Sequence, residues 1–411
     1  MLYLPYDKNY LEFPFDANQG MHLLSPPSSG FKRSESQEGI VENALSKPIA
    51  SENLAQLVEN KSNIVIITSD HTRPVPSQIT MPIILSEIRK KNKSAKVTLL
   101  ISTGMHRPMS EEEIQARFGK DVLSQVTIVN HLAEKDEDMI YLGILPSGGE
   151  LWINKLAVEA DLLIAEGFIE PHFFAGYSGG RKSVLPGIAS HKTVLFNHNS
   201  DFINSPYART GILENNPIHK DMIWAAGQAK LAYIVNVIIN SKKEIIHCVA
   251  GHPVEAHKRG CEFVEKMTAV TLKPADIIIS TNGGYPLDQN VYQAVKGMTA
   301  AEATAKDGAV IIMIAGCREG IGGNNFYHQM ADASTPKETM EKIMATLNIE
   351  TEADQWQSQI LARVLLKHKV ILVTEPKLAE QVEKMHMKYA PTLEAAFNMA
   401  LIQKVWTQKL L

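Results

Sequence analysis

The sequence predicts an α/β fold made of two doubly wound domains with mainly parallel sheets. Short apolar runs rich in Val and Ile alternate with longer amphipathic stretches, which is typical of buried parallel strands joined by helices. The chain has 411 residues and so exceeds the size of one typical core. Polar, glycine-rich segments follow several of the apolar runs, and ligands of open α/β sheets bind at the carboxyl ends of strands.

The apolar runs form two sets along the chain. The first set of predicted strands covers 63–70, 96–104, 125–131, 161–169 and 232–240. The second set covers 275–283, 308–316 and 370–375. Among the helices between them, the one from Ser110 to Phe118 has a defined start, because Ser110 and Glu113 have the spacing of a capping box. The segment "SPPSSG" at 25–30 is predicted to be a loop.

A hinge is predicted near residues 268–276, where "TLKPAD" separates the two sets of strands. We therefore expect an N-terminal α/β domain over 1–268 and a C-terminal α/β domain over 272–390. The last helix, 391–411, is expected to pack back on the N-terminal domain. Because polar loops follow strands in both sets, the functional site is expected in the cleft between the domains.

The composition is that of an ordinary globular protein, with 45% hydrophobic and 21% charged residues. A net charge of -4 gives no reason to expect nucleic acid or an anionic membrane as a partner. Cys248, Cys261 and Cys317 are widely spaced, which argues against a disulfide framework and a cysteine-ligated zinc site. The chain shows no signal-peptide pattern and no apolar run near ~20 residues, so we expect a cytoplasmic protein.

Two short loops carry candidate site residues after the first strands. In "SDHTRPVPS", Asp70 and Arg73 could cap the next helix and pair with each other, or they could belong to a site stiffened by the prolines. In "GMHRPMS", His106 could be a turn residue or a catalytic one. Neither loop decides between these readings by itself.

The stretch "EPHFFAGYSGGRKSVLPG" at 170–187 is the most unusual in the chain. Its glycines would let the backbone approach a ligand, and Arg181 and Lys182 suggest an anion, although the spacing is not that of a P-loop. His172 could equally be a packed core histidine beside its two phenylalanines. His191 and His198 could face one side of a helix, but such pairs are more often surface residues than metal sites. Four histidines, an arginine and two lysines around one predicted cleft are a stronger signal than any of them alone.

The motifs "SDHTRP", "TGMHRP", "EPHFFAGYSGGRKSVLPG", "FNH" and "NVYQAVKG" occur in an order that resembles the nickel-dependent lactate racemase family. The resemblance covers nearly the whole chain. It implies a racemase of small 2-hydroxy acids, lactate first among them, with a nickel-pincer nucleotide as cofactor. This is a pyridinium-3,5-bisthiocarboxylic acid mononucleotide that holds Ni²⁺. By resemblance Lys182 is the covalent tether, His198 the nickel ligand, and His106 and His172 the two acid–base catalysts.

Further site residues follow from the chemistry of the substrate and from the resemblance. A bidentate arginine suits the substrate carboxylate, so Arg73 is the first choice and Lys296 the second, whereas Ser86 and Trp356 match the family. Those expected to bind substrate are Arg73, Lys296, Gln293, Tyr292, Ser86 and Trp356. Those expected to bind the cofactor, besides Lys182, are Asp70, Arg73, Gly176, Ser178, Gly179 and Gly180. The neighbouring Arg181 is expected to lower the pKa of Lys182. Separate maturation proteins, one of them a nickel-inserting protein, would supply the cofactor.

The chemistry gives both histidines a purpose. The Cα hydrogen of lactate is not acidic beside a carboxylate, so hydride removal through pyruvate, after a base takes the hydroxyl proton, is the easier route. A racemase needs such a base for either enantiomer, and imidazole has a suitable pKa. Three alternatives stay open: a racemase or epimerase of another 2-hydroxy acid with the same cofactor, a zinc-dependent hydrolase using His106, His172 and His198, and a non-catalytic nucleotide-binding protein.

Overall fold

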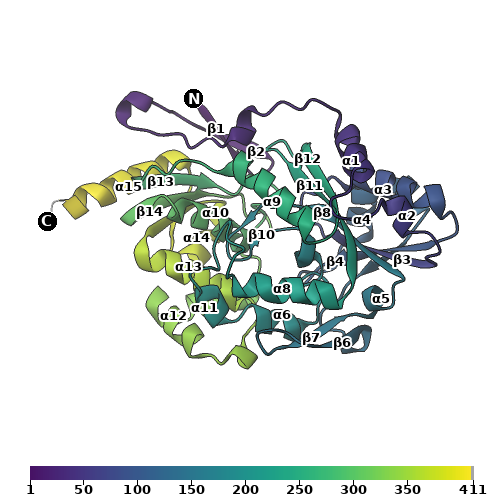
Figure 1. Cartoon of the computed structure of the whole chain (residues 1–411). Helices are drawn as coiled ribbons and strands as arrows, with labels where there is room; N and C mark the ends of the chain where they lie inside the picture. The colour runs from purple at the N-terminus through teal and green to yellow at the C-terminus, as the bar shows by residue number, and fades with distance from the viewer. Residues whose placement is uncertain (409–411) are drawn as a thin grey trace. The chain divides into compact units, whose positions relative to one another are not determined.

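The computed structural model describes residues 1–408 and divides into two compact units. The larger unit comprises Pro26–Asn197 and Ser205–Ala269. The smaller unit comprises Met1–Ser25, His198–Asn204 and the chain from Val270 onward. The main break at Ala269 and Val270 falls inside the segment predicted as the hinge. Both units are mixed α/β, which agrees with the predicted fold class (Figure 1).

The larger unit is built on a six-stranded sheet of order β12-β11-β8-β3-β4-β5. Every neighbouring pair is parallel except β11 and β12, which are antiparallel. The strands are β3 (Asn63–Ser69), β4 (Lys96–Ser102), β5 (Thr127–Asn130), β8 (Leu162–Phe168), β11 (Leu231–Ile239) and β12 (Ile245–Gly251). The five strands predicted here are confirmed, and β12 is the strand of this sheet that was not predicted.

Helices cover both faces of this sheet, which explains its nearly continuous apolar strands. On β12, Cys248 faces the core with α1, whereas its neighbour Val249 contacts Gly260 of α9 on the opposite face. The helices are α1 (Gln37–Ser46), α2 (Leu54–Leu57), α3 (Ser77–Lys91), α4 (Glu111–Leu123), α5 (Lys155–Val158), α6 (His191–Asn197), α8 (Pro217–Gln228) and α9 (Glu255–Thr268). The predicted capping box of Ser110 and Glu113 starts α4. Two hairpins complete the unit: β6 (Met139–Ile144) with β7 (Glu150–Asn154), and β9 (Pro171–His172) with β10 (Gly176–Tyr177).

The smaller unit has a four-stranded parallel sheet of order β13-β14-β15-β16. Its strands are β13 (Ala275–Thr281), β14 (Ala305–Ile314), β15 (Lys369–Val373) and β16 (Lys388–Ala390), preceded in the chain by the hairpin β1 (Leu2–Tyr6) and β2 (Asn9–Phe13). The three predicted strands are confirmed. Its helices are α7 (Ser200–Asn204), α10 (Val291–Glu302), α11 (Asn324–Ala331), α12 (Pro336–Ala345), α13 (Gln355–Lys367), α14 (Ala379–Lys384) and α15 (Leu393–Gln408).

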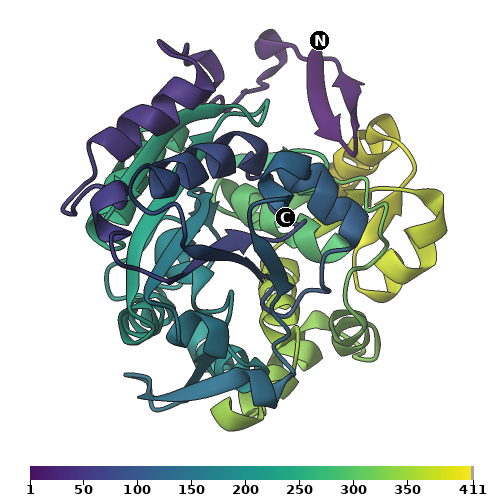
Figure 2. The same cartoon turned by 90° about the vertical axis from the view of Figure 1, so that its right-hand side faces the viewer.

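The N-terminal segment belongs to the smaller unit, so the predicted N-terminal domain starting at residue 1 needs correction. Arg318 forms a two-pronged ion pair with Asp7 at 2.7 and 3.0 Å, and the Asp7 N–H donates to Asp288. Phe13 meets Phe397 edge to face at 5.3 Å. Figure 2 shows the N-terminal strands in purple beside the last part of the chain in yellow. The hairpin β1–β2 belongs to the smaller unit because its apolar side chains pack against the core formed by β14, β15 and α15.

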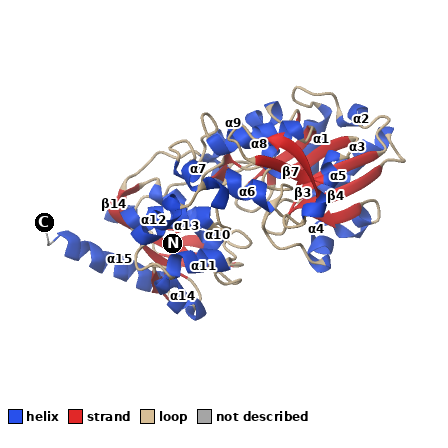
Figure 3. Ribbon diagram, turned by 90° about the horizontal axis from the view of Figure 1, so that it is seen from below, coloured by secondary structure: helices blue, strands red, loops and turns tan. Residues whose placement is uncertain are grey.

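The last helix also differs from its expected place. Leu393, Ala396 and Ala400 of α15 are buried with Ile312 of β14 and Ile371 of β15. The helix therefore covers one face of the smaller sheet, instead of packing on the N-terminal domain, and Figure 3 shows it running past β14. Residues 409–411 of the predicted segment lie outside the described part of the chain.

Two further features concern the chain's general class. Cys248, Cys261 and Cys317 are all free thiols and all buried. Over residues 1–408, we find no helix that combines the length and the apolarity needed to cross a membrane.

Candidate functional site

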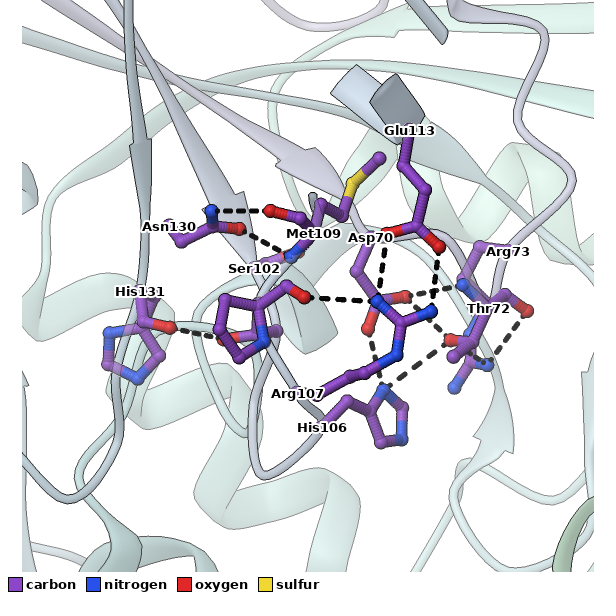
Figure 4. A network of polar contacts seen from close by, with 12 residues as sticks. Asp70, Thr72, Arg73, Ser102, His106, Arg107, Met109, Glu113, Asn130 and His131 are labelled. Carbon is purple, nitrogen blue, oxygen red and sulfur yellow. Dashed lines mark hydrogen bonds and ion pairs between the residues drawn. The ribbon is translucent and has the colours of Figure 1, made fainter. Parts of the chain in front are cut away.

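The first element of the site is a buried carboxylate bonded to a histidine. Asp70 follows β3 and His106 follows β4, so adjacent parallel strands bring the two loops together. His106 Nδ1 lies 2.7 Å from Asp70 Oδ2 (Figure 4). Asp70 Oδ1 accepts from both the Thr72 N–H at 3.0 Å and the Thr72 hydroxyl at 2.6 Å. The pKa of Asp70 is lowered, so the carboxylate is ionised and accepts from Nδ1–H, and Nε2 of a neutral ring carries the lone pair.

The charge on Asp70 is stabilised against its burial. Burial acts to raise the pKa of Asp70, but the hydrogen-bonded His106 and then Arg73 outweigh it and hold the pKa below its ordinary value. The Asp70 side chain is 2% exposed and the His106 side chain is 34% exposed. The pair therefore joins a buried carboxylate to an imidazole that a substrate could contact.

Arg73 is positioned by the same loop. Its Nη1 donates to the Thr72 hydroxyl at 2.9 Å and to the Thr72 carbonyl at 3.3 Å. Arg117, from α4, donates to the carbonyls of Asp70 and Arg73 at 2.6 and 2.7 Å. The backbone of the loop 70–73 is therefore fixed by Arg117. Only Nη1 of Arg73 bonds within this loop, which leaves most of the guanidinium hydrogens for another partner. Asp70 and Arg73 do not pair directly, so the simple capping pair is not what forms.

The His106 loop is anchored at its far end. Arg107 makes two bonds to Glu113 at 2.7 and 2.8 Å, and this hydrogen bonding is the main cause that lowers the pKa of Glu113 to about 2. The Asn130 side chain of β5 bonds both the N–H and the carbonyl of Met109 at 3.0 and 3.1 Å. Figure 4 shows these contacts around His106. The rigid anchors favour a preorganised imidazole.

His172 has a different environment from His106. It lies in β9, 8% exposed, with its ring 4.9 Å from Phe173 and 4.6 Å from Phe174. The Ala175 N–H donates to His172 Nδ1 at 3.3 Å. In the neutral ring the hydrogen is therefore on Nε2, opposite to the arrangement in His106.

Lys182 lies in the short 3-10 helix Gly180–Ser183 and is half-buried. Its Nζ is 5.7 Å from the centroid of Phe174, the ring that also contacts His172. Phe174 is thus near both the predicted tether and one predicted catalyst.

Arg181 does not act as the sequence suggested. Its side chain is 3% exposed and turns into the unit, where it donates to the Ala175 carbonyl at 2.8 Å and to His219 Nδ1 at 3.0 Å. The geometry does not support the predicted joint contact of Arg181 and Lys182 with one anion, because Arg181 bonds to groups of the protein and lines a cavity to which Lys182 does not contribute.

The glycines of this loop have internal reasons to be glycine. Gly176, Gly179 and Gly180 have φ of +78°, +74° and +52°, in the left-handed region. A Cβ on Gly176 would lie 2.4 Å from the Ile212 carbonyl oxygen, and one on Gly180 would lie 2.7 Å from the His257 ring. The Gly180 N–H donates to Asn236 at 2.7 Å, and the Ser178 N–H donates to the Glu170 carbonyl at 2.9 Å. Close packing accounts for these residues, so their predicted contact with a nucleotide phosphate has no support in this geometry.

In the smaller unit, three predicted site residues meet. The His198 ring is tilted by 59° against the Trp356 ring, and the two ring centroids are 5.0 Å apart. Trp356 Nε1 donates to the Tyr292 hydroxyl at 2.8 Å. Gln293 and Lys296 follow Tyr292 on α10, with Gln293 buried and Lys296 partly exposed. His198 is 4% exposed and lies just beyond the end of α6, so it does not share a helix face with His191.

Ser86 is not gathered with the other predicted residues. It is exposed in the second half of α3, nine residues beyond Ser77, or ~13 Å along the helix axis. Over the described chain, we find no group of three or more His, Cys, Asp or Glu side chains arranged to hold a metal, so the three-histidine zinc alternative gains no support.

Two supporting polar residues were not among those predicted from the sequence. Glu166, in the middle of β8, is buried and accepts from the hydroxyls of Thr68, Ser77 and Thr80 at 2.6, 2.9 and 2.6 Å. It fixes the start of α3, just after the Asp70 loop. Asn236 of β11 accepts the Gly180 N–H. Both could have been noticed as polar residues inside otherwise apolar strands.

Comparisons with known proteins give one consistent result. The family model described as the lactate racemase N-terminal domain matches residues 6–211, and the one described as the lactate racemase C-terminal domain matches residues 270–410. The chain is 55% identical to the lactate racemase of Thermoanaerobacterium thermosaccharolyticum over 97% of its own length and 93% of that protein. It is 51% identical to the lactate racemase of Lactiplantibacillus plantarum over 97% and 94% of the two chains.

Solved structures agree. The lactate racemase apoprotein from T. thermosaccharolyticum superposes with a TM-score of 0.92 at 54% identity, covering 97% of this chain and 94% of that one. A Thermotoga maritima protein has a TM-score of 0.68 at 19% identity over 90% and 93% of the chains, and shares the fold.

Proposed function

The chain belongs to the lactate racemase family, and from this premise we propose that it interconverts the D- and L-enantiomers of lactate. The observation that carries the proposal is the Asp70–His106 pair. A buried carboxylate fixes Nδ1–H of the ring and leaves the Nε2 lone pair on a side chain that is one-third exposed. This is the arrangement required of a general base that takes the hydroxyl proton of a 2-hydroxy acid.

Arg73 would bind the substrate carboxylate. A guanidinium matches a carboxylate with two parallel N–H donors, and only Nη1 of Arg73 bonds within its loop. Its place beside Thr72 couples it to the same loop as Asp70. The carboxylate and the hydroxyl of one substrate would thus be held by neighbouring residues.

His172 would serve the opposite enantiomer, and it begins from the other tautomer. With Ala175 N–H on Nδ1, the ring presents Nε2–H and can donate to a developing alkoxide. To accept a proton at Nε2 it must first move its hydrogen to Nδ1 and give up the Ala175 contact. The two histidines therefore have unequal resting states, which suits a reaction in which one removes and the other returns the hydroxyl proton.

The nickel-pincer nucleotide is proposed as the cofactor, with Lys182 as its tether and His198 as the nickel ligand. The residues fit such a group in two respects: Lys182 is half-buried near the face of Phe174, which contacts His172, and His198 offers an imidazole that suits nickel beside Trp356. When bound, the group would take up and return the Cα hydride of the substrate. Cofactor maturation proteins, including one that inserts nickel, are part of the proposal.

The test uses protein matured together with such partners. A single enantiomer of lactate should become a mixture of both, and intact mass spectrometry should show a covalent adduct that Lys182→Ala abolishes and His198→Ala retains with less nickel. Unmodified Lys182 in an active, nickel-containing enzyme would refute the tether. Turnover of a different 2-hydroxy acid with no turnover of lactate would refute the substrate assignment and leave the reaction type standing.

A further inference from the structure

A cavity of about 540 Å³ lies within the larger unit, beside Arg181. Its walls are apolar and come mainly from α8, β11 and the chain around it, with Leu213, Ile223, Ala226, Leu231 and Val254 among them. Exposed Lys258 and His252 lie at the rim with Glu214. None of the residues assigned above to substrate or cofactor lines this cavity.

The Arg181 side chain that lines the cavity is a buried cation with neutral partners. It bonds to His219, to the Ala175 carbonyl, and to the Ser178 and Gly179 carbonyls at 3.4 and 3.3 Å. Its Nη1 also lies 2.9 Å from Nε2 of His257, which lines the cavity too. Within residues 1–408 no carboxylate forms an ion pair with it. A buried charge without a counter-charge is costly, and such charges in proteins normally have a partner.

Arg181 and His219, which form the polar end of the cavity, also have hydrogen-bond donors available for a ligand. Burial, and then the nearby Arg181, lowers the pKa of His219 to about 3, so this ring is neutral. Because its Nδ1 accepts from Arg181 Nε at 3.0 Å, its hydrogen is on Nε2. Nη2 of Arg181 carries two hydrogens, and one of them meets the Ala175 carbonyl at 2.8 Å. The second Nη2 hydrogen and His219 Nε2–H are the donors that a ligand could use.

We propose that this cavity binds a small aliphatic carboxylate, with its anionic end on Arg181 and His219 and its alkyl chain along Ile223 and Leu231. One buried cation matches one negative charge, and Arg181 Nη2–H and His219 Nε2–H could each donate to a carboxylate oxygen. The apolar walls favour a hydrocarbon tail over a fully hydrated anion such as phosphate. Lys258 at the rim offsets the negative charge of Glu214 for an entering anion.

Gly227 offers a way to close the cavity without disturbing the fold. It lines the cavity on α8, and a Cβ there would meet no atom within 4 Å. Gly227→Leu should therefore fold, since it replaces a poor helix former by a good one, while its side chain fills the space. Gln228→Leu is the matched control, because Gln228 is exposed on the same helix and does not line the cavity.

The experiment is isothermal titration of the full-length protein with hexanoate, hexanol and inorganic phosphate. Saturable binding of hexanoate is expected in the wild type and in Gln228→Leu, and its loss is expected in Gly227→Leu. Lys258→Ala should weaken binding by about fivefold or less, as for an exposed charge. Across butyrate, hexanoate and octanoate, the affinity should rise by about fourfold for each added methylene that is buried.

Several outcomes would overturn the proposal. Hexanoate that binds Gly227→Leu as well as the wild type would be bound elsewhere, for example where the reaction's own substrate binds. If hexanol bound as tightly as hexanoate, the ligand would not need the positive charge of Arg181. If phosphate bound and hexanoate did not, the apolar walls would not contribute to binding. Racemisation by Gly227→Leu separates this proposal from the proposed function, because loss of hexanoate binding with racemisation retained supports the cavity as an independent site.

Discussion

His106 Nδ1 lies 2.7 Å from Asp70 Oδ2, and this bond joins the loops that follow two neighbouring parallel strands, β3 and β4. The carboxylate is buried and accepts two further bonds from Thr72. It cannot turn to another partner without losing them, so the orientation and the tautomer of the imidazole are fixed together.

Asp70→Asn should lower racemisation by roughly 10²–10⁴-fold, the contribution typical of a general base. The amide would present its N–H₂ or its oxygen to Nδ1, so the tautomer with the lone pair on Nε2 would lose its preference. The measurement is kcat in matured enzyme, with nickel content and thermal unfolding as checks on the fold. Thr72→Ser, which keeps the hydroxyl bond to Asp70, is the control and should keep most of the activity. An Asp70→Asn enzyme as active as Thr72→Ser would contradict the role.

Much of the fold was predictable because buried parallel strands are long, apolar and bounded by polar loops. All eight predicted strands form, and the Ser110 capping box starts α4. The N-terminal hairpin and α15 were assigned to the wrong domain, because the local sequence shows that a surface is apolar but not which core it packs against. The loop at 170–187 shows the same limit: Arg181 was expected to share an anion with Lys182, but its side chain bonds to the Ala175 carbonyl and to His219, 38 residues along the chain.

The unequal tautomers of His106 and His172 predict unequal half-reactions. Because the two enantiomers have equal free energies, any variant must lower kcat/KM equally in both directions of racemisation. Formation of keto acid from one enantiomer, measured in a single turnover, is free of this constraint. His106→Ala should abolish it for one enantiomer and His172→Ala for the other, each by roughly 10²–10⁴-fold. Loss of both half-reactions in each variant, with the fold and nickel intact, would argue against separate bases.

Gly180→Ala should destabilise the larger unit, since its φ is +52° and the new Cβ would lie 2.7 Å from the His257 ring. A cost of about 1–3 kcal/mol in unfolding free energy is expected from strain and displaced packing. Gly227→Ala makes the same chemical change in open space on α8 and should stabilise by about 0.5–1 kcal/mol. Chemical denaturation of the two variants tests the pair. If Gly180→Ala were as stable as the wild type, close packing would not explain this glycine, and the approach of a ligand to the backbone would again be its expected role.

Arg181 and Lys182 should differ sharply when each is replaced by Ala. Arg181 is buried and donates to the Ala175 carbonyl and to His219, so Arg181→Ala leaves these acceptors without a donor and should cost about 2–4 kcal/mol. Lys182 is half-buried, and Lys182→Ala should change stability by about 0.5 kcal/mol or less while removing the covalent adduct. Thermal unfolding of protein made without maturation partners measures both, free of any cofactor contribution. If Arg181→Ala and Lys182→Ala were equally stable, the buried hydrogen bonds of Arg181 would not stabilise the fold as expected.

His131 should make the protein sensitive to acid. It is fully buried: its Nε2–H donates to the Ala189 carbonyl at 2.9 Å, and Nδ1 accepts from Asn154 at 3.1 Å. Burial is the main cause that lowers its pKa to about 4. Between the ordinary histidine pKa near 6.5 and pH 4, the unfolded chain binds a proton that the folded one does not. The contribution is therefore complete above pH 6.5 and is lost as the pH falls towards 4.

The loss amounts to about 3 kcal/mol for this one residue. Urea unfolding across that pH range should show a fall in unfolding free energy that is smaller by about this amount in His131→Gln, which stays neutral throughout. His219 and His257, also buried and with lowered pKa values, are unchanged in the variant and cancel in the comparison. Replacement of exposed His22 by Gln is the control for the substitution itself. Parallel pH curves for the wild type and His131→Gln would mean that groups other than His131 cause the loss of stability in acid.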